Sequence, residues 1–402
     1  MWLIPHFAIP GIAVFRPPAA SVFLFFWACF FLMSPQAVRL RISTTDAYRV
    51  WLALFIIYCI ISSAYGYWNL GIIGKLTLDL NKGSIEYVQV VIDRLLQLIL
   101  VLVAFEVVRH SRHSLRKIMR WWLQGLSGAV FLHILCYAIT SDTLLQRAGT
   151  FNEGNVAGLY YLLSIFVALE YKRLAPLNSS ANLFLFAGIL GLLLSGSTAA
   201  LTLAIMLLSL NCILSATSRR RLLIRIMTLV VVLPLVVAAI TAAGLDFGIR
   251  EKLFEEDVTV QSFSRIDRLE SIGVAIELFS ENPLIGHGLQ AYGFISNERL
   301  SGPLQVIYDG SFRRIPNNIY AELAAELGLI GLGLYLGFIA TLINGVVKRT
   351  GTGRRHWLLG LTGVLLYWNA FPSYSVVFIW VFFGLITKSL KSSTPASTPS
   401  AA

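Results

Sequence analysis

The sequence predicts an all-α fold, a polytopic integral membrane protein of about 12 transmembrane helices with one large polar loop that contains amphipathic helices. Composition is the first observation. The chain has 402 residues, of which 56% are hydrophobic and 13% are charged, whereas a soluble domain carries about 25% charged residues. The second observation is that apolar runs able to cross a ~30 Å hydrocarbon core recur along the whole chain. The third is that the short loops expected on one side of the membrane are basic, whereas those expected on the other side are not.

The apolar runs define the expected elements in chain order. Several are shorter than the ~20 residues that a transmembrane helix needs, and Pro5 and Pro10 interrupt the first. The predicted spans are 2–15, 20–34, 47–67, 86–108, 118–139, 154–172, 181–195, 198–215, 222–243, 319–346, 356–371 and 373–389. The domains that follow are N-terminal transmembrane helices (1–243), a large loop (244–318), C-terminal transmembrane helices (319–390) and a tail (391–402) whose Ser, Thr, Pro and Ala content predicts disorder.

Charge predicts the orientation of these helices. When both termini are assigned to the cytoplasm, every short loop on that side is basic, as Arg219, Arg220 and Arg221 illustrate. An excess of Lys and Arg is typical of short cytoplasmic loops in membrane proteins. The large loop, by contrast, contains more acidic than basic residues. We therefore expect it on the exterior or periplasmic side.

Net charge and cysteine content exclude several kinds of function. The formal net charge is +11, but the excess lies in short loops beside the membrane, which favours contact with anionic lipids over nucleic-acid binding. The four cysteines lie within apolar runs, without CxxC or Cys/His spacing for zinc. No acidic cluster is suited to a metal, so we expect neither a metal nor another cofactor. We also expect no cleaved signal peptide, because the first residues carry no basic segment.

The large loop contains a predicted amphipathic helix over 264–280, too polar to span and expected to lie on the membrane surface. Ser264 resembles an N-cap with Asp267 three residues later, and Asn282-Pro283 ends the run. Arg265 and Arg268 share one side of this helix. They suit a clamp for a phosphate group, because forked guanidinium donors match phosphate oxygens; the alternative is an interfacial pair that snorkels into the lipid headgroups.

Two further pieces of the loop are candidates for substrate binding. Gly286-His287-Gly288 allows close backbone approach, and His287 could titrate near neutral pH or serve only a structural role. Arg313-Arg314 precedes the next apolar run and is expected to contact lipid phosphates, either as a binding site or as an anchor.

The helix predicted after the loop carries carboxylates at its mouth. Asn318, Glu322 and Glu326 recur every four residues, so they stack on one face of a helix that Asn residues are suited to cap. Carboxylates in the first turns of a spanning helix are costly unless they face protein or water, and functional roles are typical. The alternative is pairing with the helix N-terminus and a loop arginine. Asp93 and Arg94 are likewise charged residues inside an earlier apolar span. As sequence neighbours on a helix they point apart, so each must find a different partner.

Several of these motifs occur together in one family. They are Arg147–Asn155, which contains Gly149-Thr150-Phe151 and Asn155, then Leu194–Thr198, Ser264-Arg265, Asn282–Gly288, Pro316–Tyr320 and Glu326–Gly331. Over roughly residues 145–390 the chain resembles the membrane-bound O-antigen ligase and O-antigen polymerase (Wzy-type) superfamily. The resemblance implies substrate contacts by Asn155 and Ser197, and catalytic positions at Arg265 and at residue 317.

The chain departs from the family pattern at two positions. Thr198 stands where the family commonly has an arginine after the Ser-Gly-Ser element, and Asn317 stands where it commonly has a histidine. The first departure removes one expected phosphate-binding arm. The second removes the histidine proposed as base or orienting group in the ligases, so we expect Asn317, Glu322 and Glu326 to supply the catalytic groups together with Arg265.

The resemblance implies transfer of a glycan from an undecaprenyl-diphosphate carrier at the periplasmic face of the bacterial inner membrane. The acceptor is either another lipid-linked repeat unit, for a polymerase, or lipid A–core, for a ligase, and the missing histidine favours the polymerase. Expected partners are the lipid-linked glycan, membrane lipids and a chain-length regulator protein, but no nucleic acid. A secondary transporter and a flippase for lipid-linked sugars are the alternatives, disfavoured because the polar residues gather in one external loop rather than at the midplane.

Overall fold

The computed structural model describes residues 47–72, 83–139, 153–216, 260–299, 316–348, 353–371 and 374–391, with short pieces near 149–151 and 218–228. Within these residues the regular structure is helical throughout, as the sequence predicts. Five of the described helices are long and apolar enough to cross a membrane. The predicted spans at 2–15 and 20–34, and most of 222–243, lie outside the described residues, so the total of about 12 stays a prediction.

The helix boundaries follow the predicted spans closely. The described elements are α3 (Ala47–Ile72), α4 (Gly83–His110), α5 (Leu115–Ile139), α7 (Gly154–Leu174), α8 (Ser180–Leu194), α9 (Thr198–Leu214), α12 (Val260–Glu281), α13 (Tyr292–Ile295), η1 (Ser296–Arg299), α15 (Ile319–Val347), α16 (Gly353–Tyr367) and α17 (Val377–Lys391). The amphipathic loop helix is therefore present as α12, and it ends before Asn282-Pro283 as predicted. It begins earlier than expected, so the prediction that Ser264 is its N-cap is wrong: Ser264 lies inside the helix.

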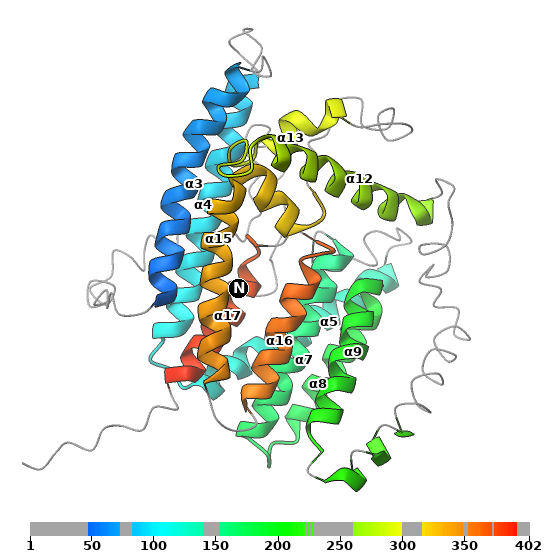
Figure 1. The fold of residues 1–402 in the computed structure, drawn as a ribbon. Helices are drawn as coiled ribbons and strands as arrows, with labels where there is room; N and C mark the ends of the chain where they lie inside the picture. The colour runs from blue at the N-terminus through cyan, green and yellow to red at the C-terminus, as the bar shows by residue number, and fades with distance from the viewer. Residues whose placement is uncertain are drawn as a thin grey trace, which may run out of the picture. The chain divides into compact units, whose positions relative to one another are not determined.

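The chain divides into two compact units, and two of the divisions fall within α5 and α12, while the others fall on either side of α16. Unit 1 contains α3, α4, α13, α15, α17 and α12 from Arg268 onward. In this unit α15 packs along α3 and α17 packs along α4, so four long elements lie side by side (Figure 1). The axis of α12 runs across the direction of α3 and α4 rather than along it (Figure 1), as expected for a helix that does not span.

Aromatic side chains hold α4, α15 and α17 together. The ring centroids of Phe338 and Trp380 lie 5.4 Å apart and nearly parallel, and Phe105 meets both rings edge-on. Each such pair contributes about 0.5–1.5 kcal/mol beyond its buried area. Directional ring packing matters here because lipid tails are as apolar as the core, so water exclusion does little to drive helices together inside a membrane.

The outward face of α3 is apolar. Trp51, Leu54, Ile57, Ile61 and Trp68 are all exposed, and they recur at helical spacing. A helix that is hydrophobic on its exposed side as well as its packed side is typical of a membrane span. This pattern supports contact of the α3 face with lipid.

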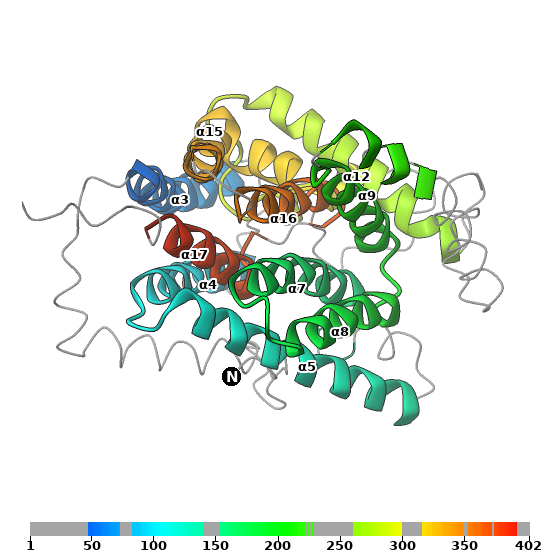
Figure 2. The same cartoon turned by 90° about the horizontal axis from the view of Figure 1, so that it is seen from below.

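Unit 2 contains Trp122–Asp267 and Gly351–Tyr367 and is organised around α7. Helix α7 packs against α8, α16 and α9 (Figure 2), and most of its residues are buried. On α5, the indole Nε1 of Trp122 donates a hydrogen bond to Ser164 on α7 at 2.8 Å. Helix α7 is thus a central span surrounded by other helices.

Candidate functional site

The mouth of α15 is built by asparagine capping. Asn318 has extended backbone dihedrals, and its Oδ1 accepts hydrogen bonds from the backbone N–H groups of Tyr320 and Ala321 at 2.9 and 3.0 Å. This satisfies two of the N–H groups that a helix start leaves unpaired. The side-chain amide of Asn318 also donates to Asn369 at 3.3 Å. Asn318 is therefore a helix cap, as its residue type predicts, and its substrate contact stays a prediction.

Helix α15 is interrupted at Gly328, where φ is 62° and ψ is −167°. Figure 1 shows the first turns of α15 bending away from the rest of the helix. This backbone conformation is essentially restricted to glycine. The interruption leaves carbonyl groups before Gly328 and N–H groups after it without partners inside the helix.

The loop that follows α12 supplies these missing partners. The N–H groups of His287 and Gly288 donate to the carbonyl oxygens of Ala325 and Glu326 at 3.0 and 2.8 Å. In return, the N–H groups of Leu329 and Ile330 donate to the carbonyl oxygens of Pro283 and Leu284 at 2.8 and 3.2 Å. Buried backbone groups must be paired, so the loop and the interruption of α15 each require the other.

Glycines make this contact close enough. A Cβ on Gly286 would lie 2.4 Å from the backbone of Glu326, and a Cβ on Gly288 would lie 2.1 Å from the Cα of Gly66 on α3. Both loop glycines also have positive φ, which other residues rarely adopt. The prediction that Gly286 and Gly288 allow a close backbone approach is confirmed, although the partner is the protein's own backbone.

His287 lies buried among α3, α12 and the loop. Its Nδ1 accepts from the side-chain amide of Asn69 at 3.2 Å, and its Nε2 then donates to the carbonyl oxygen of Leu278 at 3.0 Å. Both ring nitrogens of the neutral imidazole are thereby used. Burial lowers the pKa of His287 below its usual value. These contacts describe a structural histidine, and the predicted contact between His287 and substrate remains untested.

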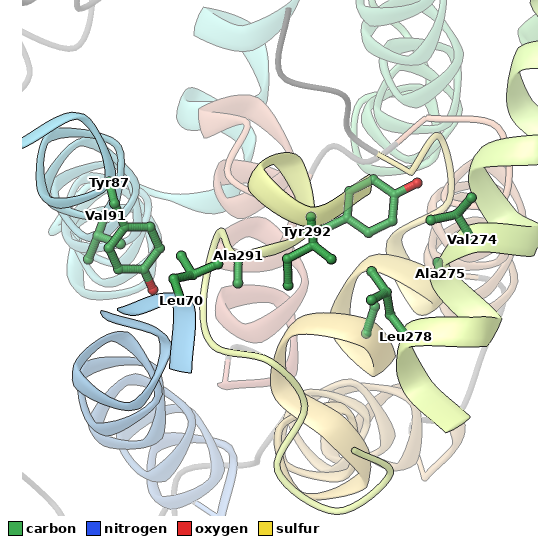
Figure 3. Packing of buried hydrophobic residues seen from close by; sticks show 10 residues of the cluster. Leu70, Tyr87, Val91, Val274, Ala275, Leu278, Ala291 and Tyr292 are labelled. Atoms are coloured by element: carbon green, nitrogen blue, oxygen red, sulfur yellow. The ribbon is translucent and has the colours of Figure 1, made fainter. Parts of the chain in front are cut away.

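A hydrophobic cluster also holds the loop that follows α12 in place. Figure 3 shows Val274, Ala275 and Leu278 of α12 meeting Tyr292, with Leu70, Tyr87 and Val91 on α3 and α4 at the other side of Ala291. The hydroxyl of Tyr87 adds a hydrogen bond to the carbonyl oxygen of Leu289 at 2.8 Å. The segment 282–292 is therefore held on α3, α4, α12 and α15 at once.

Glu326 is a buried carboxylate that fastens this segment. Its side chain is 2% exposed and accepts hydrogen bonds from the backbone N–H groups of Gln290 and Tyr292. Gln290 adopts a positive φ of 63°, a conformation uncommon for a non-glycine residue and costly without compensating contacts. The carboxylate of Glu326 stabilises that turn.

Glu322 lies one turn earlier on the same face of α15, as the spacing predicts, and it has a different environment. This residue is 1% exposed, and Nη2 of Arg94 on α4 lies 4.0 Å from its Oε1. Among the described residues neither of its carboxylate oxygens has a hydrogen-bond partner. The described partner therefore comes from α4. Pairing with a loop arginine, the alternative that the sequence left open, stays a prediction, because Arg313 and Arg314 lie outside the described residues.

Arg94 is held from its other side. Its Nη1 donates to the hydroxyl of Ser375 at 2.8 Å, and its guanidinium lies over the ring of Tyr374 at 5.1 Å from the centroid. Its neighbour Asp93 instead accepts from Gln97 at 2.6 Å. The expectation that these sequence neighbours find separate partners is confirmed.

A group of buried aromatic residues lies beside Arg94, whose guanidinium contacts one of them, Tyr374. The rings of Tyr335 and Tyr374 lie 6.2 Å apart, and Trp368 lies 5.5 Å from Tyr335. All three residues are fully buried. Within the described part of the chain, neither tyrosine hydroxyl nor the indole Nε1 of Trp368 has a hydrogen-bond partner. Such groups are costly to bury, and each can bind a hydroxyl-bearing molecule.

The predicted arginines are less fully described. Arg268 is half-buried on α12, and Arg265 lies on the same helix, but the side chain of Arg265 is outside the described residues. Arg313 and Arg314 lie in 300–315, also outside them. Asn317 lies half-buried directly before the Asn318 cap. The phosphate-binding role of the arginines therefore stays a prediction.

In unit 2 the structure brings together two motifs that are far apart in sequence. The hydroxyl of Ser197 donates to Oδ1 of Asn155 at 3.1 Å and lies 3.1 Å from the hydroxyl of Tyr367, which donates to the backbone carbonyl of Asn155 at 2.7 Å. Ser197 also caps α9 by accepting from the N–H of Ala200. The two predicted residues are thus in direct contact, and Tyr367 completes the group.

Sequence reasoning missed the partners of these residues. Arg94 was recognisable as an ionisable residue inside a span, but nothing in its local sequence pointed to Glu322, which is more than 200 residues away. Tyr374 and Ser375 carry no motif. Tyr367 follows an apolar run and reads as an ordinary interfacial tyrosine. In the described part of the chain, no group of three or more His, Cys, Asp or Glu side chains is placed to hold a metal ion.

Comparison with known proteins bears on the segment that carries most of this geometry. A model of the O-antigen ligase family matches residues 183–336, which include Ser197, α12, the 282–292 segment and the mouth of α15. No curated protein matches the chain. The resemblance predicted from the motifs is confirmed over this segment: residues 183–336 are similar to the O-antigen ligase family.

Proposed function

We propose that this protein polymerises oligosaccharide repeat units carried on undecaprenyl diphosphate, at the periplasmic face of the bacterial inner membrane. The family match points to an activity of the O-antigen ligase or polymerase type. The choice of polymerase, the lipid carrier and the side of the membrane are proposals.

The observation that carries the proposal is the buried Arg94–Glu322 pair beside Glu326, at the mouth of a membrane helix. Ionisable residues inside a membrane protein are retained at a cost and are functional by default. A hydroxyl acceptor needs a group that orients it and receives its proton. Glu322, whose oxygens have no described hydrogen-bond partner, can do both.

The reaction balances without a cofactor. The oxygen of an acceptor hydroxyl attacks the anomeric carbon of the donor sugar, and the bond from that carbon to the diphosphate oxygen breaks. Undecaprenyl diphosphate leaves with the electron pair, and the acceptor's proton passes to a carboxylate at the mouth of α15. Negative charge grows on the leaving diphosphate, and guanidinium groups stabilise such charge when they are already in place. Arg265 and Arg268 on α12 are proposed for that role.

One feature favours a polymerase over a ligase. Asn317 replaces the histidine proposed as base or orienting group in the ligases. A carboxylate at Glu322 offers another proton acceptor close to residue 317 along the helix. The ligase, which transfers the glycan to lipid A–core, is the alternative and is the activity that gives the matched family its name.

Reconstitution tests the reaction directly. Purified protein in liposomes receives an undecaprenyl-diphosphate-linked repeat unit, with and without lipid A–core, and products are resolved by gel electrophoresis and mass spectrometry. A ladder of longer lipid-linked glycans without lipid A–core supports the polymerase. Product only when lipid A–core is present identifies the ligase. Movement of unaltered substrate across the bilayer, without new glycosidic bonds, would instead identify a transporter or flippase.

Cysteine labelling tests the proposed side of the membrane. In a variant without the native cysteines, a cysteine at Ser301 in the large loop should react with a membrane-impermeant maleimide in intact spheroplasts. A cysteine at Ser218, in a loop assigned to the cytoplasm, should react only after the membrane is permeabilised. The reverse pattern would contradict the periplasmic location of the site.

A further inference from the structure

We infer that Arg94 is a positioning residue for glycan transfer, holding Glu322 as the carboxylate that receives the acceptor's proton, whereas Glu326 is a structural carboxylate. The inference rests on the proposed function, because it assigns separate roles to two carboxylates that sequence spacing alone cannot distinguish. Both acidic residues lie on one face of α15, and both are almost fully buried. Their partners separate them.

Glu326 is committed to the protein backbone. It accepts hydrogen bonds from the N–H groups of Gln290 and Tyr292, and its own backbone carbonyl accepts from Gly288. Both contacts fix the 282–292 segment in a conformation that includes the positive φ of Gln290. Its Oε2 has no hydrogen-bond partner among the described residues, but the two backbone contacts keep this carboxylate turned toward the loop, so we assign Glu326 to holding the segment.

Glu322 has charge compensation without being hydrogen-bonded. The 4.0 Å separation from Arg94 is too long for a hydrogen bond but short enough for strong attraction in a low-dielectric interior. The lone pairs of both carboxylate oxygens are therefore left for another donor. An acceptor hydroxyl is such a donor, and the buried hydroxyls of Tyr335 and Tyr374 and the indole of Trp368 provide further polar contacts nearby.

Other ion pairs in the protein show what a structural contact looks like. In unit 1, Arg49 binds Glu106 through two hydrogen bonds of 3.1 and 2.8 Å. In unit 2, Arg173 binds Glu170 through two of 2.9 and 2.7 Å. Arg94 does not close on Glu322 in this manner, because Ser375 and Tyr374 engage its guanidinium on another side. The arrangement keeps a cation beside Glu322 but leaves the lone pairs of its carboxylate oxygens without a hydrogen-bond donor.

A double-mutant cycle tests this assignment. The variants are Glu322→Gln, Arg94→Met, the double variant Arg94→Met/Glu322→Gln, and Arg94→Lys. Each is measured for folded yield and thermal stability in detergent, and for kcat and KM with the lipid-linked repeat unit. A control cycle uses Arg49→Met and Glu106→Gln, a bidentate pair in the same unit in which Glu106 also contacts Arg109 and His110.

The expected result separates folding from catalysis. Arg94→Met should lose folded protein, because it leaves an unpaired buried carboxylate, and the double variant should recover it. The double variant should remain as inactive as Glu322→Gln, with kcat lowered about 10²–10⁴-fold and KM little changed. Arg94→Lys should retain more activity than Arg94→Met, because it keeps the charge. In the control cycle every variant that folds should be active.

Several outcomes would overturn the inference. A folded Arg94→Met/Glu322→Gln variant with wild-type turnover would make the pair purely structural. Additive effects of the two substitutions on stability would show that the residues do not interact. Loss of kcat in Glu326→Gln but not in Glu322→Gln would exchange the assigned roles. If wild-type protein forms no glycan product, the proposed function fails, while the stability cycle still decides whether Arg94 and Glu322 are coupled.

Discussion

Gly328 lies directly against Leu284: a Cβ on Gly328 would come within 2.3 Å of the carbonyl oxygen of Leu284. This contact lies at the centre of the exchange of backbone hydrogen bonds between α15 and the loop after α12. The same loop continues to Gln290, whose N–H binds Glu326. The position of the loop and the bend in α15 therefore depend on each other.

Substitution of Gly328 by Ala should destabilise the protein. The residue has φ 62° and ψ −167°, a combination that costs a non-glycine residue about 1–3 kcal/mol, and the added Cβ would also collide with the backbone of Leu284. Thermal unfolding in detergent measures the effect. Gly333→Ala is the control on the same helix, because a Cβ there meets nothing within 4 Å. Equal stability of the two variants would contradict the described loop contact.

Stability should fall as pH decreases through the ordinary range of histidine ionisation, with His287 as one cause. Burial lowers the pKa of His287 in the folded protein, so below about pH 6.5 the unfolded chain binds a proton that the folded chain does not. The contribution of His287 is thus present above that pH and is lost below it. Protonation would also remove the ability of Nδ1 to accept from Asn69.

Thermal melts between pH 8 and pH 5 test this expectation. The wild-type midpoint should decrease toward pH 5, and His287→Gln should show a lower midpoint at pH 8 with a shallower pH dependence. The Glu281–Arg299 pair acts in a different window, because Arg299 lowers the pKa of Glu281 and that contribution is lost only below about pH 4.5. An unchanged slope in His287→Gln would show that this histidine does not titrate with unfolding.

Ser197→Ala should weaken unit 2. The substitution removes the hydrogen bond to Asn155, the contact with the hydroxyl of Tyr367 and the cap of α9. Leaving buried polar groups without a partner costs about 1–3 kcal/mol. The loss is measured as a lower unfolding midpoint, relative to Thr202→Ala at an exposed position of the same helix. Identical midpoints for Ser197→Ala and the wild type would mean that this hydrogen-bonded group is not formed.

Arg265→Lys should already lose most glycan transfer. A lysine keeps the charge but cannot reproduce the two parallel hydrogen bonds that guanidinium makes to a diphosphate. Arg265→Ala should abolish turnover without lowering the amount of inserted protein. Arg299→Lys is the control, because Arg299 pairs with Glu277 and Glu281. Full activity of Arg265→Lys would assign Arg265 to the membrane interface instead of the diphosphate.

Helices were the most predictable part of the structure. Apolar length alone locates α3, α7 and α15 to within a few residues, because the thickness of the bilayer limits where a span can begin and end. The N-terminus of α12 was predicted less well. Ser264 has the residue type of a cap, but the helix extends before it, since a local preference of about 1 kcal/mol is easily overridden by packing.

Contacts across long sequence separations could not be predicted. The spacing of Glu322 and Glu326 places them on one face, yet their different roles depend on Arg94 and on the N–H groups of Gln290 and Tyr292. Gly286 and Gly288 were predicted to allow a close approach, but the backbone they approach was not identified. These partners depend on how α4, α12 and α15 pack together, and this packing cannot be predicted from the local sequence of any one helix.

The turnover of Glu322→Gln in proteoliposomes tests the central claim most directly. The amide keeps the volume of the side chain but cannot receive a proton, so kcat for glycan transfer should decrease about 10²–10⁴-fold. Arg94 keeps its contacts with Ser375 and Tyr374 in this variant, so the protein should still insert and fold, and turnover is compared per folded protein; Asn317→His should retain activity. Wild-type turnover by Glu322→Gln, with equal protein per liposome, would contradict the assignment of proton acceptance to this carboxylate.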